Sequence, residues 1–179
     1  MEQVRGVIPA VRQMKDFEKA LQTNHQWIIL LDTRLGQLKS MVDYAKRNDK
    51  KVLVHIDLVQ GLKADEYGVE FLVQEVKPDG ILSTRGSVIE AVKKHRLLAI
   101  QRLFLLDRLS FDSNVKLSGK TKADYIELLP GTMPNIIKEI QTKTDIPIIA
   151  GGLITNKSEI TAAMEAGAVA VSTSDASLW

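Results

Sequence analysis

The chain has 179 residues, of which 45% are hydrophobic and 26% charged, and this composition is ordinary for a globular domain. Its 24 basic and 22 acidic residues give a net charge of +2, which argues against a strongly basic nucleic-acid-binding domain. The lack of cysteine excludes disulfides and thiolate chemistry, and the apolar runs are too short to span a membrane.

In chain order, the opening MEQVRGVIPAVR lacks the layout of a secretion signal, so we expect a cytoplasmic protein. Short apolar, β-branched runs then alternate with stretches in which apolar residues recur every three or four positions. The runs predict strands at 6–11, 27–32, 52–58, 80–84, 98–105, 125–129, 147–150 and 169–172. The stretches between them predict helices, and the weakest of these is DRLSFDSNVKLSGKTK after the fifth strand.

Strands that are apolar on both faces and joined by helices form parallel sheets. Eight such units favour an α/β fold, a compact single-domain (β/α)₈ TIM-like barrel over residues 1–179, in which the helix after the fifth strand is a candidate for degeneration. The alternative is an open doubly wound sheet. That fold favours a glycine-rich turn after the first strand, and VIPAVRQMK contains none.

Small residues follow the last two predicted strands. Gly151 and Gly152 follow the seventh strand, and Ser172, Thr173 and Ser174 end the eighth. Barrels frequently bind a phosphate at these two loops, through converging glycine amides and hydroxyl donors. The final DASLW is long enough for a short helix whose first amides would face the same point. Each motif alone is more simply a turn or a polar loop, but together they favour a phosphate site.

Charged side chains also occupy predicted strands or the residues just beyond them. They are Arg12, His55, Asp57, Arg85, Arg102 and Glu127, with a turn at Gly131 closely following the last of these. Carboxylates accept hydrogen bonds from hydroxyl groups, and arginine supplies charge near a phosphate. A small phosphorylated polyol satisfies both. For each arginine the alternative is an ion pair inside the barrel with Asp57, Glu127 or Asp32.

The stretch VHIDLVQG is similar to the His-x-Asp strand of ribulose-phosphate 3-epimerases, which are phosphate-binding barrels with a metal and an aspartate pair. The other histidines, His25 and His95, fall at the wrong end of the predicted barrel, and Ala150 stands where the epimerase pattern has aspartate. No predicted strand contains a lysine for Schiff-base chemistry. We therefore expect no metal, no cofactor and no catalytic residue. A metal-free isomerase or epimerase of a small sugar phosphate, with Glu127 or Asp57 as base, stays open.

A resemblance covers nearly the whole chain. The blocks PAVRQMKDFEKAL, HIDLVQGL, DEYGVEFL, STR, LLAIQRLFLLD, IELLPG, PIIAGGLI and AGAVAVSTS, in this order, resemble the glycerol uptake operon antiterminator regulatory proteins. The resemblance implies a cytoplasmic bacterial regulator of transcription that senses glycerol-3-phosphate. It implies action on leader mRNA of glycerol-utilisation genes, which prevents premature termination, and no catalysis.

If RNA binds, three basic clusters are candidates. Arg108, Lys116, Lys120 and Lys122 follow the fifth strand, and we prefer this cluster because we expect it near the ligand face. The other two are Lys46, Arg47, Lys50 and Lys51, and Lys93, Lys94 and Arg96. Each of these two runs is more simply a solvated helix end whose cations complement the helix dipole.

Overall fold

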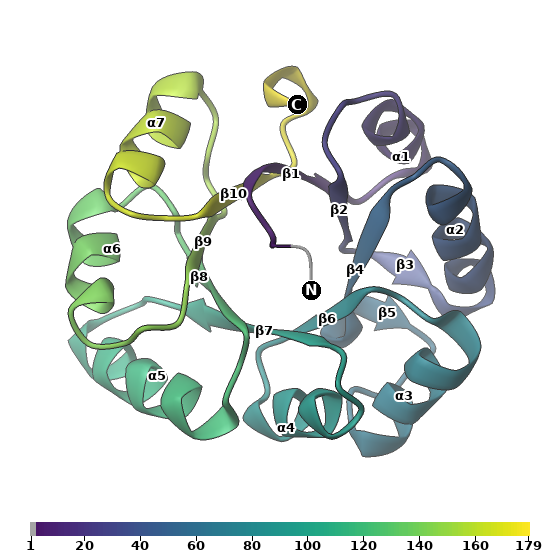
Figure 1. Ribbon diagram of the computed structural model, residues 1–179, viewed down its shortest axis with the longest axis horizontal. Helices are drawn as coiled ribbons and strands as arrows, with labels where there is room; N and C mark the ends of the chain where they lie inside the picture. Colours follow the sequence, from purple (N-terminus) through teal and green to yellow (C-terminus); the bar gives the residue numbers. More distant parts are fainter. Residues whose placement is uncertain (1–2) are drawn as a thin grey trace.

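The computed structural model describes residues 3–179, apart from the side chains of residues 108–110, 112, 114, 115 and 118. Eight parallel strands close into a barrel in the spatial order β1-β10-β9-β8-β7-β6-β4-β2 (Figure 1). They are β1 (Gly6–Val11), β2 (Trp27–Leu30), β4 (Lys51–His55), β6 (Gly80–Ser83), β7 (Leu98–Phe104), β8 (Tyr125–Leu129), β9 (Ile148–Gly151) and β10 (Ala170–Thr173). The predicted TIM-like barrel is confirmed.

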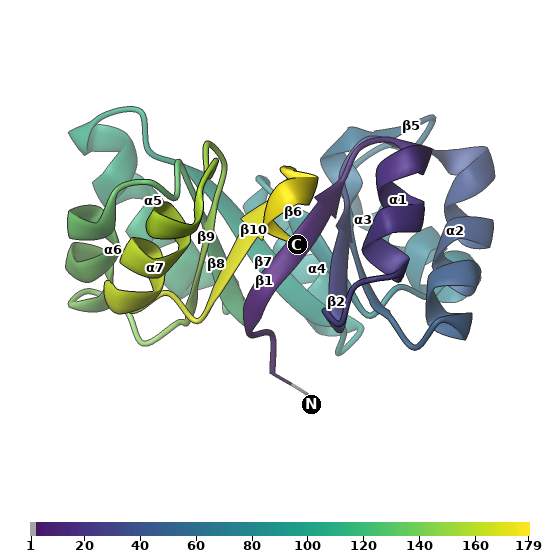
Figure 2. The same cartoon turned by 90° about the horizontal axis from the view of Figure 1, so that it is seen from above.

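Helices surround the barrel and run back along its outside (Figure 2). They are α1 (Met14–Leu21), α2 (Leu35–Arg47), α3 (Glu66–Phe71) continued by η2 (Leu72–Val76), α4 (Gly86–Lys94), α5 (Arg108–Thr121), α6 (Pro134–Gln141) and α7 (Lys157–Glu165). A 3-10 turn, η3 (Ala176–Leu178), follows β10. Two short strands, β3 (Thr33–Arg34) and β5 (Val59–Gln60), pair outside the barrel.

The helices bury the faces that their sequence spacing predicts. Phe17, Ala20 and Leu21 of α1 are buried, because residues three and four apart share one side of a helix. Local signals also set the helix ends. The Asp65 carboxylate accepts from the Gly68 amide at the start of α3, and the Asn156 side chain accepts from the Glu159 amide at the start of α7.

The barrel interior changes from apolar to polar along the strands. On β7, Leu98 and Ile100 pack in the inner core, and Arg102 follows on the same face toward the C-terminal end. On β8, Tyr125 packs in this core and Glu127 follows. Arg102 and Glu127 are partners in the register of these two strands. The change of side-chain type places the polar groups at the end of the barrel where the strand-to-helix loops begin.

Some predicted elements differ from the observed ones. The helix after the fifth barrel strand, α5, is not degenerate, since it has 14 residues and buries Phe111. The run 52–58 is not one strand, because a 3-10 turn, η1 (Ile56–Leu58), interrupts it after His55. A lysine does occur in a strand, since β4 begins at Lys51. That lysine lies at the N-terminal end, over the ring of Trp27.

Candidate functional site

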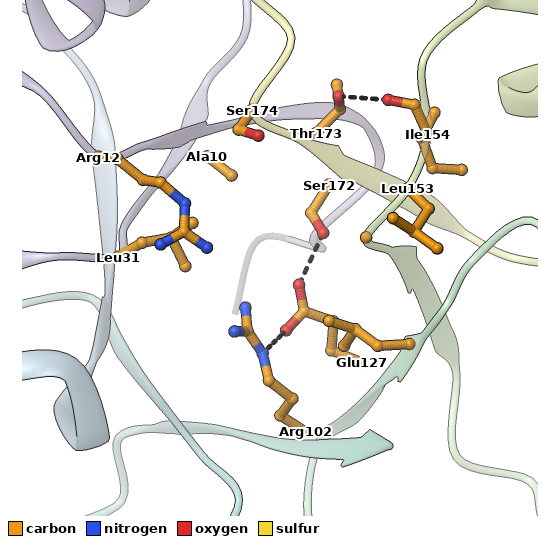
Figure 3. Close-up of a pocket in the computed structure, with 12 residues that line it drawn as sticks. Ala10, Arg12, Leu31, Arg102, Glu127, Leu153, Ile154, Ser172, Thr173 and Ser174 are labelled. Atoms are coloured by element: carbon orange, nitrogen blue, oxygen red, sulfur yellow. Dashed lines mark hydrogen bonds and ion pairs between the residues drawn. The ribbon is translucent and has the colours of Figure 1, made fainter. Parts of the chain in front are cut away.

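A small cavity opens at the C-terminal ends of the strands (Figure 3). Its volume is about 80 Å³, which suits a small molecule rather than a drug-sized one. We call it the strand-end cavity. It is lined by Ala10, Arg12, Leu31, Arg102, Glu127, Leu129, Gly152, Leu153, Ile154, Ser172, Thr173 and Ser174. The loops after β9 and β10 therefore meet as the sequence predicts, and β1, β7 and β8 complete the wall.

Glu127 is held from both sides at the base of this cavity. The Ser172 hydroxyl donates to its Oε1 at 2.6 Å, and Arg102 Nε donates to its Oε2 at 2.6 Å (Figure 3). The side chains of Arg102 and Glu127 are 8% and 1% exposed. The interior ion pair that the sequence left open for Arg102 is thus present. It fixes a carboxylate on the cavity wall, and each carboxylate oxygen can accept a further hydrogen bond.

Arg12 supplies a second cation to the cavity. It follows β1, and its guanidinium group points into the space between the strands in Figure 3. Arg12 is exposed and forms no ion pair with the described part of the chain. Its charge is therefore available to an anionic ligand.

Gly151 and Gly152 are required for different structural reasons. A Cβ on Gly151 would lie 2.4 Å from Ser172 Oγ and 2.9 Å from Glu127 Oε1, so only glycine allows the Glu127 arrangement. Gly152 and Leu153 have φ of 73° and 60°, so two successive residues are left-handed. No acceptor within the described residues receives the amides of Leu153 and Ser174. Free amides of this kind form anion-binding concavities.

The hydroxyl donors differ from the sequence prediction. Ser172 is occupied by Glu127, and Thr173 Oγ1 donates to the Ile154 carbonyl at 3.1 Å while accepting from the Asp175 amide. These two hydroxyls shape the cavity, and the exposed Ser174 is the hydroxyl left for a ligand. The predicted short helix is also only a 3-10 turn. Its Ser177 amide donates to the Asp175 carboxylate, so this amide does not face the cavity freely.

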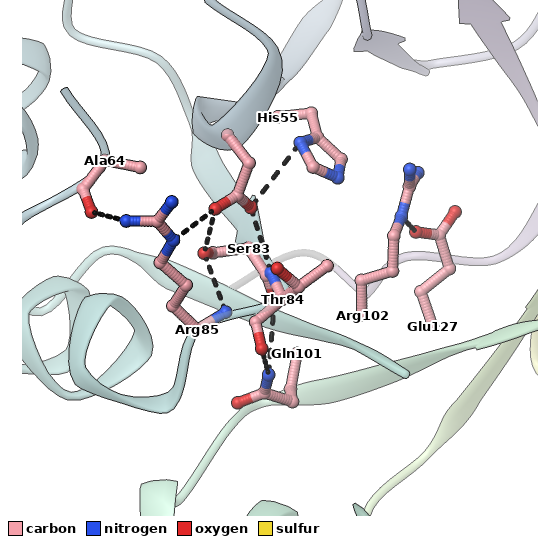
Figure 4. Close-up of polar contacts among 9 residues, drawn as sticks. His55, Ala64, Ser83, Thr84, Arg85, Gln101, Arg102 and Glu127 are labelled. Carbon is pink, nitrogen blue, oxygen red and sulfur yellow. Dashed lines mark hydrogen bonds and ion pairs between the residues drawn. The ribbon is translucent and has the colours of Figure 1, made fainter. Parts of the chain in front are cut away.

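His55, Asp57 and Arg85 do not line the strand-end cavity. They form a neighbouring cluster around the Asp57 carboxylate (Figure 4). Asp57 accepts from Ser83 Oγ at 3.1 Å and from the Thr84 amide at 2.9 Å, and Arg85 Nε lies 3.4 Å from it. The turn η1 explains the difference, because it removes Asp57 from the inward-facing alternation of β4.

His55 is buried between the two carboxylates. Burial, and then the charge of Arg102, lower the pKa of His55 to about 4, so the ring is neutral at pH 7. Its Nδ1 lies 3.7 Å from Asp57 Oδ2, too far for a hydrogen bond, and has no other partner in the described part of the protein. Among those residues, no group of His, Asp and Glu side chains is arranged to hold a metal ion.

Gly131 supports the cavity from behind rather than lining it. Its amide donates to the Gly151 carbonyl at 2.6 Å, and a Cβ at Gly131 would lie 2.6 Å from the Gly151 nitrogen. The sequence did not reveal Ser83 or Gln101, which belong to the Asp57 cluster, or the apolar wall at Leu31 and Leu129. Gln101 stands directly before Arg102 in a buried strand. Two adjacent polar residues in this apolar run were the sequence signal that could have pointed to Gln101.

The preferred basic cluster is not gathered at the ligand face. Helix α5 begins after β7 and advances about 1.5 Å per residue toward the opposite end of the barrel. Lys120 and Lys122, at and just beyond the end of this helix, are exposed there. Lys116 is exposed midway, and the side chain of Arg108 lies outside the described residues. In the other clusters, Lys93 pairs with Asp124, and Lys94 pairs with Glu66. Lys50 is buried and donates to the His25 carbonyl.

In the described part of the chain, none of the helices has both the length and the apolar content needed to cross a bilayer.

Comparison with known proteins finds similarity over almost the whole chain. Residues 7–179 match the family model described as glycerol-3-phosphate responsive antiterminator. An Escherichia coli protein described as the uncharacterized protein YgcP is 32% identical, over 97% of this chain and 91% of that protein.

Two crystal structures are similar over almost their whole length. One is a glycerol uptake operon antiterminator regulatory protein from Listeria monocytogenes, with 45% identity, coverage of 97% of this chain and 94% of that chain, and a TM-score of 0.95. The other is a glycerol uptake operon antiterminator-related protein from Thermotoga maritima, with 26% identity, coverage of 99% of both chains and a TM-score of 0.88.

Proposed function

The chain belongs to the glycerol-3-phosphate responsive antiterminator family, and from this premise we propose that it binds glycerol-3-phosphate in the strand-end cavity. The bound form then acts on leader mRNA of glycerol-utilisation genes in the cytoplasm and prevents premature termination. The protein needs no cofactor for this role and catalyses no reaction. The proposal rests on one observation. The strand-end cavity has a cation and hydrogen-bond donors at one side and a fixed carboxylate acceptor at the other.

At one side of the cavity, Arg12 and the amides of Leu153 and Ser174, which have no partner among the described residues, offer donors and positive charge. These groups suit a phosphate. At the other side, the fixed Glu127 carboxylate offers acceptor positions for hydroxyl groups. A phosphate joined to a short carbon chain with two hydroxyls fits both sides.

Two substitutions at one glycine test the phosphate assignment. Gly152→Asp and Gly152→Asn add side chains of equal size at a left-handed residue, a conformation that both side chains tolerate. Only Gly152→Asp places a negative charge beside the free amides. Calorimetry should show that the wild type binds glycerol-3-phosphate and not glycerol. Gly152→Asp should abolish binding, and Gly152→Asn should retain it more nearly.

Equal binding of glycerol and glycerol-3-phosphate, or equal loss in both variants, would contradict the phosphate assignment. Melting curves of the two variants serve as the control, since both should unfold at similar temperatures. The RNA step has its own test, which is the affinity for the leader transcript with and without glycerol-3-phosphate. We expect tighter binding with ligand, because a ligand shifts a protein toward the state that it binds better.

An isomerase or epimerase of a small sugar phosphate is the second candidate, and one observation favours it. Glu127 is a buried carboxylate on the wall of the strand-end cavity, a suitable position for a general base. Incubation of the protein with dihydroxyacetone phosphate or pentose phosphates, followed by NMR, decides between the candidates. Turnover that disappears in Glu127→Gln would establish the enzyme, and no turnover is expected of the regulator.

A further inference from the structure

A second cavity lies beside the first, and the two share Arg12. We call it the helix-start cavity, because α1 and α2 both begin at its wall. Its volume is about 220 Å³, and its polar lining includes Arg12, Gln13, Asp32, Thr33, Arg34 and Gln37. None of the functional assignments made above uses this space.

The helix-start cavity carries unpaired positive charge. Arg12 and Arg34 are both exposed, and neither has an ion-pair partner within the described residues. Arg34 is held in place by the backbone, because its strand β3 pairs with β5. The one carboxylate of the lining, Asp32, accepts from Gln60 Nε2 at 3.2 Å. Two arginines against one aspartate leave the cavity positive.

The backbone adds donors at the same place. The residues before α1 and α2, Gln13 and Arg34, make no side-chain capping bond, and α2 has no acidic residue in its first turn. Asp65 and Asn156 cap α3 and α7, whereas α4 and α6 also lack a side-chain cap, and α1 has Asp16 in its first turn. The first amides of an uncapped helix remain available to an anion. Here two such helices begin around one cavity.

Thr33 is an independent sign of a missing partner. It lines the helix-start cavity, its side chain is 7% exposed, and its Oγ1 has no hydrogen-bond partner within the described part of the chain. A buried hydroxyl without a partner costs about 1–3 kcal/mol in general, so such groups ordinarily have one. Because Oγ1 itself is almost inaccessible, a rotation about χ1 would turn it toward a polar group bound in the cavity.

From these features we infer that the helix-start cavity binds a phosphodiester of RNA, an inference that rests on the proposed function. Arg12, Arg34 and the helix amides suit a backbone phosphate. The Asp32 carboxylate suits the 2′-hydroxyl of the adjoining ribose, the group that distinguishes RNA from DNA. The exposed arginines and the position of the cavity at the surface allow a polymer to reach it.

The shared Arg12 explains how ligand and RNA affect each other. Without ligand, its guanidinium has no ionic partner in the described part of the protein. A phosphate in the strand-end cavity orders this side chain, whose planar group carries donors enough for two phosphates. RNA then binds a preordered arginine. By reciprocity, RNA tightens ligand binding by the same factor.

Arg34→Ala and Arg5→Ala form a matched pair for the test. Both remove one exposed arginine, and Arg5 lies just before β1, at the opposite end of the barrel strands. Calorimetry measures glycerol-3-phosphate affinity, and fluorescence anisotropy measures affinity for the leader transcript of the glycerol-utilisation genes at several salt concentrations. Arg34→Ala should lower RNA affinity about 10-fold and reduce the salt slope by about 0.7–1.

Ligand affinity of Arg34→Ala should stay within about twofold of the wild type, because Arg34 does not line the strand-end cavity. Arg5→Ala should change neither quantity. The RNA affinity of Arg34→Lys should lie between those of the wild type and Arg34→Ala, since lysine keeps the charge and loses the planar group.

Three other outcomes would contradict this inference, and one of them would also contradict the proposed function. Wild-type RNA affinity in Arg34→Ala overturns this inference and leaves the proposed function standing. No RNA binding by the wild type with ligand overturns both. Two glycerol-3-phosphate molecules per chain, reduced to one in Arg34→Ala, would assign the helix-start cavity to a free phosphate ester instead of RNA.

Discussion

The carboxylates of Glu127 and Asp57 have the same kinds of neighbour, but Glu127 is buried and Asp57 is only partly buried. Each is contacted by a serine and an arginine. Glu127 lines the strand-end cavity and is paired with a buried arginine, whereas Asp57 lies outside that cavity and also accepts from the Thr84 amide. The Asp57 arginine has a side chain that is 59% exposed. The comparison teaches that a carboxylate is available to a ligand when its donors leave one side open.

The largest expected effect belongs to Glu127→Ala. This change leaves the buried Arg102 without its partner, and breaking a buried pair in this way costs about 3–5 kcal/mol of stability. It also removes the acceptor from the strand-end cavity, so calorimetry should show loss of glycerol-3-phosphate binding. Urea denaturation measures the stability. A variant as stable as the wild type would mean that Arg102 finds another partner.

A pH dependence should come from His55, between the two carboxylates. Its folded pKa is about 4 and its ordinary value is 6.5, so the unfolded chain binds more protons between these values. Stability should therefore fall as pH falls through this range, by up to about 3 kcal/mol. Arg102, Asp57 and Glu127 are the charged groups that act on this ring.

The measurement is the difference in unfolding free energy between the wild type and His55→Gln at pH 7 and pH 4.5, since other titrating groups cancel in that difference. His95→Gln, at the exposed end of α4, is the control. A pH profile of His55→Gln parallel to that of the wild type would show that His55 does not contribute.

The smallest effect is expected for Arg85→Ala. Its ion pair with Asp57 is 3.4 Å long and its side chain is largely exposed, and such pairs contribute about 0–1 kcal/mol. Ligand affinity should be unchanged, because Arg85 does not line the strand-end cavity. A loss of ligand binding in Arg85→Ala would show that the two carboxylate centres act as one.

The sequence predicts the barrel and the approximate position of the cavity because both depend on local patterns. Alternation locates the strands, and Gly151, Gly152 and the serine-rich end of β10 locate the loops. Periodicity does not show where a strand yields to a turn, so η1 moved Asp57 away from the predicted site. Proximity in sequence also misleads after a strand, as Lys120 and Lys122 show, since α5 carries them to the opposite end of the barrel.

The strand-end cavity is assembled from opposite ends of the described chain. Arg12 follows β1, Ser172 and Thr173 belong to β10, and the register pairs Gly6 with Ala170 and Pro9 with Thr173. Closing a loop of this length is entropically unfavourable and slow, so this pairing has a high contact order. A growing polypeptide on the ribosome therefore has no complete ligand site until β10 has emerged. Any ligand of this cavity can bind only after β10 has been made.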